Sequence, residues 1–242
     1  MGYPNRAIKW GYEGIKLAQS HNFSLIAARL ATAFIHKQRG DIEETEKQAD
    51  LIIQHANENG LPGPVLWASI FKGWVLGQTG EHDKGISLIL DSIAKLGYKD
   101  PAYMSMLVEL YILANMPKEG LQLVDELSEI IESKNEYNYE PELLRLRSEL
   151  LILQAKAHAS GQIQKDDVEA IEKGFINSLN VANKQGAISL QLRTATSLAR
   201  FLKDLGRSEE GKNLLSKVYN RFSEGLDSSD LKKARLTLED LS

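Results

Sequence analysis

The chain has 242 residues, of which 43% are hydrophobic and 26% are charged, and its formal net charge is −4. This balance is ordinary for a globular protein that is long enough to bury a sizeable core in one or two domains. The basic excess that binds a nucleic-acid backbone is missing. We therefore expect no nucleic-acid partner and favour a neutral partner surface or a small ligand.

Cysteine is absent from the sequence, which excludes disulfides, thiolate nucleophiles and cysteine-ligated zinc. Residues 1–10, MGYPNRAIKW, lack the apolar segment of a secretion signal. The longest apolar run, ELLILQA at 149–155, is far shorter than the roughly 18–20 residues that span a bilayer. We therefore expect a cytoplasmic protein with no membrane partner.

Apolar residues recur at helical spacing along nearly the whole chain, as at Leu25, Ala28, Thr32 and Ile35, and no run alternates as a strand would. Breaks rich in Gly, Asn and Pro separate about ten helices, which we interpret as helical hairpins. The longest hydrophilic break is 157–167. The predicted hairpins are 23–59, 60–98, 99–137, 138–185 and 186–226, preceded by one helix in 1–22 and followed by one in 227–242.

Small residues are spaced regularly around the predicted turns. Gly73 stands seven residues before the turn residue Gly80, and Gly85 stands five after it; Ala199 and Gly211 take the same offsets around Gly206. Two helices whose backbones cross closely require small residues at such positions. A small residue in the first helix (helix A), a turn glycine and a small residue in the second (helix B) are typical of the tetratricopeptide (TPR) repeat.

The repeat is longer than the usual one. Turn-to-turn spacings from Gly2 to Gly40, Gly80 and Asn115 are 38, 40 and 35 residues, against about 34 in a standard TPR. We therefore predict an all-α fold, a TPR-like α-α superhelix in which five elongated hairpins form a single solenoid over 1–242. An irregular helical bundle is the alternative.

The two ends of the chain differ. The helix in 1–22 aligns with a helix B whose helix A is missing, so we expect a C-terminal fragment of a longer protein. Alternatively Met1 is the native start, and this helix caps the stack or mediates a homodimer. At the other end, Asp227–Asp230 offers N-cap chemistry, and 227–242 carries one apolar face, as a capping helix does.

The glycine-rich stretch GWVLGQTGEHDKG at 73–85 does not fit a phosphate site. A P-loop places its lysine after the last glycine and a hydroxyl next, whereas Lys84 precedes Gly85 here. A dinucleotide fingerprint follows a strand, yet the preceding LWASIFK is predicted as helix. The five histidines form no metal-ligand spacing, and no serine lies in a nucleophile elbow. We predict no enzyme activity, no cofactor and no metal site.

A ligand groove is the remaining candidate site, because the A helices of TPR arrays line a concave face. An aromatic anchor beside an arginine-rich wall would suit a peptide with one hydrophobic side chain and a carboxylate. The alternative is that the tryptophans belong to the core and the arginines are simply solvated. The candidate groove residues are Trp67, Ile70, Trp74, Glu109, Arg145, Glu149, Arg193, Arg200 and Lys203.

The C-terminal third resembles the end of large bacterial signalling ATPases, in SLQLRTATSLARF at 189–201, the GR turn at 206–207 and VYNRFSEGLDSSDLKKA at 218–234. A weaker likeness extends over the rest of the chain. In that family a cyclase or DNA-binding domain and a STAND-type ATPase module precede a long TPR-like tail. Relatives tend to have glycine where Ser148 stands, so we expect the 138–185 hairpin to pack more loosely.

The resemblance implies a non-catalytic regulatory or sensor tail that binds a protein or peptide, possible partners including the chain's own upstream domains. A structural dimerisation or spacer module without a groove ligand is the alternative. The residues leave both functions open.

Overall fold

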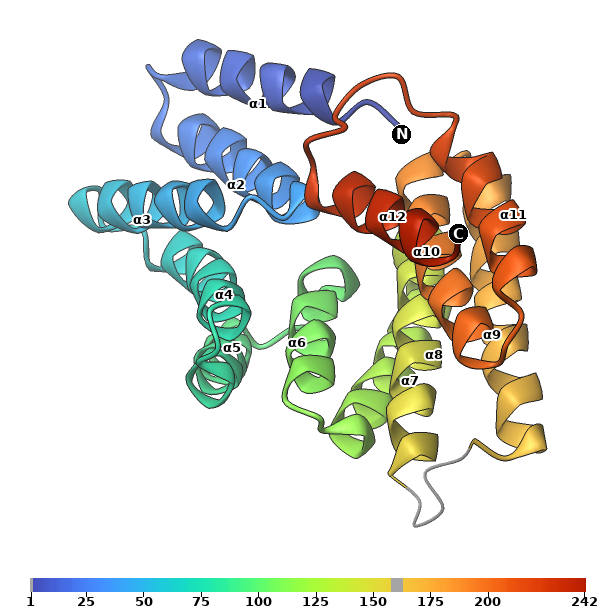
Figure 1. The fold of residues 1–242 in the computed structure, drawn as a ribbon. Helices are drawn as coiled ribbons and strands as arrows, with labels where there is room; N and C mark the ends of the chain where they lie inside the picture. The colour runs from blue at the N-terminus through green and yellow to red at the C-terminus, as the bar shows by residue number, and fades with distance from the viewer. Residues whose placement is uncertain (1, 158–162) are drawn as a thin grey trace. The chain divides into compact units, whose positions relative to one another are not determined.

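The computed structural model describes residues 2–157 and 163–242, which are helical throughout with no strand in these ranges (Figure 1). The predicted class, an all-α repeat of antiparallel helical hairpins, is confirmed. Residues 158–162 of the predicted break at 157–167 lie outside the described residues. The chain divides into two compact units, residues 3–99 and residues 100–242 with Gly2. That one continuous solenoid joins them stays a prediction.

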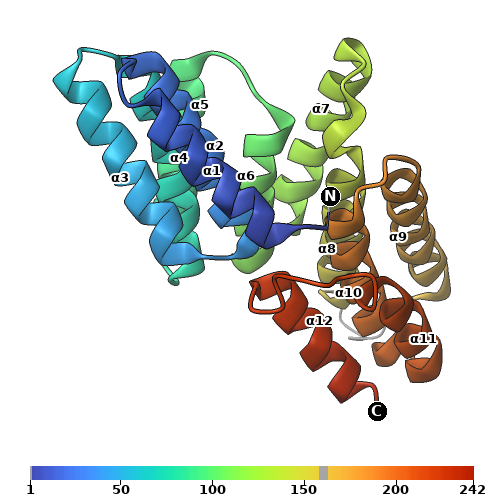
Figure 2. The same ribbon diagram turned by 90° about the horizontal axis from the view of Figure 1, so that it is seen from above.

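The unit 3–99 contains one single helix followed by two hairpins (Figure 2). Helix α1 packs against α2, whereas α3 packs against both α2 and α4. The hairpin α2–α3 occupies the predicted range 23–59 to within one residue, and α4–α5 occupies 60–98. The helices are α1 (Pro4–Ala18), α2 (Asn22–Arg39), α3 (Ile42–Glu58), α4 (Pro62–Gln78) and α5 (His82–Leu96).

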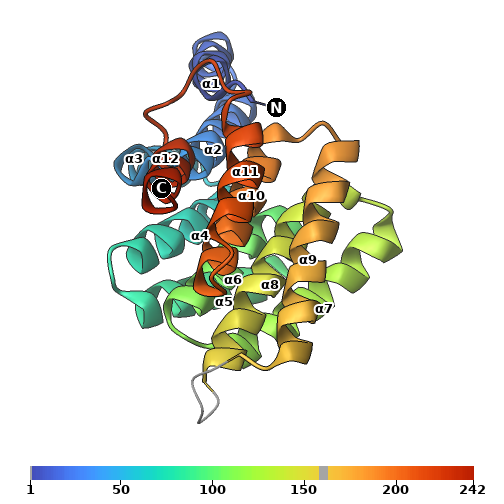
Figure 3. The ribbon, with the colours of Figure 1, turned by 45° about the vertical axis from the view of Figure 1, so that its right-hand side comes forward.

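The unit 100–242 continues the alternation, and α8 and α9 run side by side in it (Figure 3). Helices α6, α8 and α10 take the helix A positions, and α7, α9 and α11 take the helix B positions. The elements are α6 (Pro101–Leu113), α7 (Pro117–Lys134), a short 3₁₀ turn η1 (Tyr137–Tyr139), α8 (Glu140–Lys156), α9 (Lys165–Lys184), α10 (Ile188–Asp204), α11 (Ser208–Tyr219) and α12 (Ser229–Asp240).

The turns between paired helices have the backbone that the sequence predicts. Gly80, between α4 and α5, has φ +97°, a left-handed conformation that favours glycine. Asn115, between α6 and α7, takes the same role with φ +55°, which asparagine tolerates better than most residues. These residues end their helices and reverse the chain within a few positions.

The small residues lie where two helices cross, as predicted. A Cβ added at Gly73 of α4 would stand 2.7 Å from the carbonyl oxygen of Gly85 on α5, so the two backbones touch. In the α8–α9 hairpin, Ser148 is buried, and a Cβ on Gly174 would meet its hydroxyl. The absence of a side chain at Gly174 on α9 therefore leaves space for the Ser148 side chain on α8. The two helices can pack closely with serine at this position, without the looser packing that we expected.

Helix α12 caps the unit through its apolar face. Leu231 and Ala234 are buried in a cluster with Leu192, Ala199 and Leu215 of α10 and α11. The start of α12 differs from the prediction. Its N-cap residue Ser228 makes no side-chain capping bond, and Asp230 is engaged elsewhere, as described below.

Candidate partner-binding face

The predicted aromatic anchors lie in α4 of the unit 3–99. Ile70 is fully buried and Trp74 is 4% exposed, with the ammonium of Lys37 5.7 Å from the Trp74 ring centre. Trp67 is half-buried and meets the ring of Tyr98 edge-on at 5.5 Å. We therefore do not retain Ile70 and Trp74 as ligand contacts, since their side chains belong to the core; Trp67 remains accessible in part.

The physical reason is that α4 is apolar on nearly every side. Its sequence PGPVLWASIFKGWVLGQ gives no polar face to mark the side that a ligand could reach. Gly73, Gly77 and Val75 are buried along with Phe71. Helical spacing alone thus placed both tryptophans on one face without deciding which face is buried.

Charged side chains of the unit 100–242 converge between α8, α10 and α12. This arginine–carboxylate cluster consists of Glu142, Arg145 and Glu149 on α8, Arg193 and Ser197 on α10, and Asp230 on α12. Three of the predicted groove residues belong to it, and a fourth, Glu109 on α6, acts electrostatically on Arg193. The structure thus brings these four predicted residues into one neighbourhood, where they interact with one another; that they line a ligand groove stays a prediction.

Arg145 is the centre of the α8 part of the cluster. Its Nε and Nη2 donate to the two carboxylate oxygens of Glu142, each at 2.9 Å, and its Nη1 donates to Glu149 Oε1 at 2.7 Å. The hydroxyl of Ser197 donates to the same oxygen of Glu149 at 2.5 Å. Glu142 is 1% exposed, so its charge is stabilised by these partners rather than by water.

Arg193 extends the cluster from α8 to α12. Its Nη1 donates to Glu142 Oε1 at 3.1 Å, and its Nε donates to Asp230 Oδ2 at 2.6 Å. A single guanidinium therefore links carboxylates from the helices on either side of α10. Because arginine holds its donors in a rigid fork, this contact fixes the register of the three helices.

Both arginines are held in their charged form. Burial opposes the charge of Arg145, but Glu142 and Glu149 outweigh it and raise its pKa above the ordinary arginine range. Burial likewise opposes the charge of Arg193, and Asp230, Glu142 and Glu109 together raise its pKa. Both guanidiniums already form ion pairs with carboxylates of the chain. They therefore hold the helices of this face together and are not available to bind a ligand carboxylate.

The last two predicted groove residues lie further along α10. Lys203 forms an ion pair with Asp240 of α12. Arg200 is exposed, and no hydrogen bond or ion pair to another described residue involves it. Lys156 of α8 pairs with Asp204 at 2.8 Å. We call the face that α8 and α10 form the α8–α10 face; of its cationic side chains in the described residues, Arg200 is the one that has no ion pair with a described residue.

Three members of the cluster were missed by sequence reasoning. Glu142 stands three residues before Arg145, a spacing that brings two side chains together on a helix, so this signal was present. Asp230 was interpreted as part of an N-cap, and Ser197 carries no signal of its own. Their roles depend on how α10 meets α8 and α12, which helical spacing does not determine.

A second polar cluster joins three helices of the unit 3–99. The hydroxyl of Tyr12 on α1 lies 3.2 Å from Nε2 of His36 on α2 and donates to Glu44 of α3 at 3.1 Å. Nδ1 of the buried His36 lies 3.1 Å from Asp41 Oδ2, which also accepts from Arg39. These contacts fasten α1 to the hairpin that follows it.

The surface has further hollows besides the two clusters, among them a shallow, open depression on α5 around Lys84 and Asp91. A hollow between α8 and α9, lined by Leu151, Ala155 and Ile171 among others, measures about 40 Å³, far below the volume of ordinary small-molecule pockets. Within residues 2–157 and 163–242, no group of three His, Asp or Glu side chains is arranged to hold a metal ion. None of the described helices combines the length and apolar character needed to cross a bilayer.

Comparison with known proteins adds no family assignment. A scan against protein-family models gave no match, and a search of curated proteins gave no significant match.

Proposed function

We propose that this chain is a non-catalytic interaction module whose α8–α10 face binds an acidic segment of a protein or peptide. The proposal rests on Arg200, which is exposed and makes no hydrogen bond or ion pair with another described residue. Four cationic side chains on this face, Arg145, Lys156, Arg193 and Lys203, are paired with carboxylates of the chain. Arg200 stands among them exposed.

The surroundings of Arg200 favour binding in two ways. The arginine–carboxylate cluster one to two turns away fixes the helices that present this side chain, so little order has to be gained on binding. An arginine also recognises a carboxylate with two parallel hydrogen bonds, which gives direction as well as charge attraction.

The wider role is drawn from the resemblance at the C-terminal third. We propose a regulatory or sensor tail of a multidomain ATPase, cyclase or transcriptional regulator, with the upstream domains as one source of the acidic segment. No catalytic step is assigned to the chain.

Selection from a displayed library of random short peptides tests the binding proposal. The wild-type chain is expected to enrich peptides that carry one or more carboxylate side chains. Arg200→Glu should abolish this enrichment, whereas Arg235→Glu, a matched change at an exposed arginine of α12, should leave it intact. Absence of any enriched class, or an equal loss with both variants, would refute the proposal.

A further inference from the structure

An unusual row of exposed apolar side chains runs along α1. Tyr3, at the N-cap, Trp10 and Leu17 are spaced by seven residues, so they lie on one side of the helix at intervals of two turns. Trp10 is 62% exposed and Leu17 is 85% exposed. The opposite flank is packed instead, with Ile15 buried and Gly11 close to Thr32 of α2.

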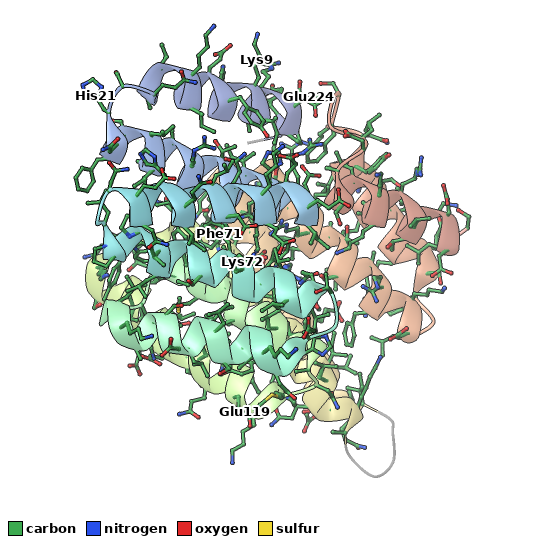
Figure 4. All side chains as sticks on the ribbon, turned by 90° about the vertical axis from the view of Figure 1, so that its left-hand side faces the viewer. Lys9, His21, Phe71, Lys72, Glu119 and Glu224 are labelled. Carbon is green, nitrogen blue, oxygen red and sulfur yellow. The ribbon has the colours of Figure 1, made fainter. Side chains whose placement is uncertain are left out.

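Within the described part of the chain, the helices that pack against α1 leave this row exposed. Helix α3, an equivalent helix B, packs between α2 and α4, whereas α1 packs against α2. Lys9 on α1 points away from α2 (Figure 4). The stripe Tyr3–Trp10–Leu17, which we call the α1 stripe, is therefore a helix face that another helix can cover.

The α1 stripe has a pattern that complements itself. Reversing the helix about Trp10 places Tyr3 of one copy opposite Leu17 of another, because each lies seven residues from Trp10. Charges at the edge follow the same symmetry: Arg6 lies four residues before Trp10, and Glu13 lies three after it. Arg6 of each copy would then meet Glu13 of the other copy, so the interface would contain two equivalent Arg6–Glu13 ion pairs.

We propose that α1 forms an antiparallel twofold contact with α1 of a second copy of this chain, through the α1 stripe and the reciprocal Arg6–Glu13 pairs. A twofold interface requires a surface that matches itself, and the reciprocal Arg6–Glu13 pairs meet this requirement. Arg6 lies over the Tyr3 ring at 4.0 Å in a single copy, a position from which it would also reach Glu13 of the second copy. In a single copy Glu13 makes a long, exposed ion pair with Lys9 at 4.0 Å, which is easily exchanged.

One helix per subunit makes a small interface, below the roughly 1,200 Å² of standard complexes, so the dimer is expected to be weak and reversible. Analytical ultracentrifugation of the full chain from about 1 µM to about 1 mM covers the range of such affinities. We expect a monomer at the low end and a dimer at the high end. A monomer at every concentration would overturn the proposal.

Variants identify the surface. Trp10→Ala should raise the dimer Kd at least about tenfold, as loss of a central aromatic anchor does. Phe23→Ala, at a residue that is 71% exposed on α2 and outside the stripe, should leave Kd unchanged. Equal weakening by both variants would place the contact elsewhere and contradict the model.

The charge pairs give an orientation test. Arg6→Glu and Glu13→Arg should each weaken self-association, and an equimolar mixture of the two variants should associate, since every edge charge then meets its opposite. A mixture that associates no better than either variant would rule out the antiparallel register. None of these residues belongs to the α8–α10 face, so this result and the peptide-binding result are independent.

Discussion

Arg193 of α10 and Asp230 of α12 are joined by a hydrogen-bonded ion pair of 2.6 Å, and ten residues further along both helices Lys203 pairs with Asp240. Equal spacing on the two helices means that α10 and α12 run parallel and in register. Helix α12 thus takes the position of a further helix A. Charge matching sets this register, while the apolar face of α12 supplies the burial.

Replacing Arg193 should loosen α12. In Arg193→Leu the Asp230 carboxylate loses its partner and the link to Glu142 is broken, so α12 is expected to open more often. Hydrogen exchange of the α12 amides should speed up at least about tenfold, the equivalent of 1.4 kcal/mol. The control Arg235→Leu removes an exposed arginine of α12 that has only a 3.7 Å pair with Glu239. Unchanged exchange in Arg193→Leu would show that the ion pair does not hold α12.

Removal of Arg145 should cost far more stability than removal of its neighbour Arg147. Arg145→Met leaves Glu142 buried with one guanidinium fewer, and breaking a buried pair costs about 3–5 kcal/mol. Arg147→Met breaks an exposed pair with Asp125, which costs below about 1 kcal/mol. Urea unfolding monitored by circular dichroism measures both variants. Similar losses for the two would mean that the cluster adds no more than a surface pair.

Gly73→Ala should be destabilising although alanine is the better helix former. The new methyl would meet the Gly85 carbonyl oxygen at 2.7 Å and the Ile89 side chain, and such overpacking costs about 1–3 kcal/mol. Gly14→Ala on α1 is the matched control, because the nearest atom to its new methyl is 3.9 Å away; it should gain up to about 1 kcal/mol. Thermal melts at low protein concentration compare the two. A stabilised Gly73→Ala would contradict the close crossing.

The contact of Tyr12 should depend on pH at the alkaline end. Burial and the hydrogen bond to Glu44 raise the pKa of the Tyr12 phenol, so the folded state favours the protonated ring. Its contribution to stability is complete below the pKa of an unfolded tyrosine, about 10, and is lost as pH rises through the higher folded value. The difference in unfolding free energy between wild type and Tyr12→Phe should therefore shrink above about pH 10. A constant difference up to alkaline denaturation would contradict this assignment.

The sequence predicted the helical fold well because local signals determine it. Gly80 and Asn115 are residue types that tolerate a left-handed backbone, and both adopt it at the turns. Gly73 and Gly85 lie where two helices cross closely. Both signals can be recognised within a few residues of sequence, without knowledge of distant contacts. The breaks rich in Gly, Asn and Pro, together with the apolar spacing, then suffice to define the hairpins.

Prediction of the site went less far, since it depends on which side of a helix meets a neighbour. Trp74 and Ile70 are buried in an apolar helix that shows no polar face. Arg145 and Arg193 were placed in a groove, yet each is matched by carboxylates from the same or adjacent helices. Partner choice between charged groups is a tertiary property. Helical spacing predicts which charged residues lie on the same side of a helix, but it does not predict which of them form ion pairs.

Hydrogen exchange of the full chain, with and without a peptide selected on the wild type, tests the proposed binding face most directly. Added peptide should slow exchange in α8 and α10, most strongly around Arg200, and the same peptide should leave Arg200→Glu unprotected there. Protection confined to residues 3–99, or protection of α10 that persists in Arg200→Glu, would contradict the assignment of the α8–α10 face.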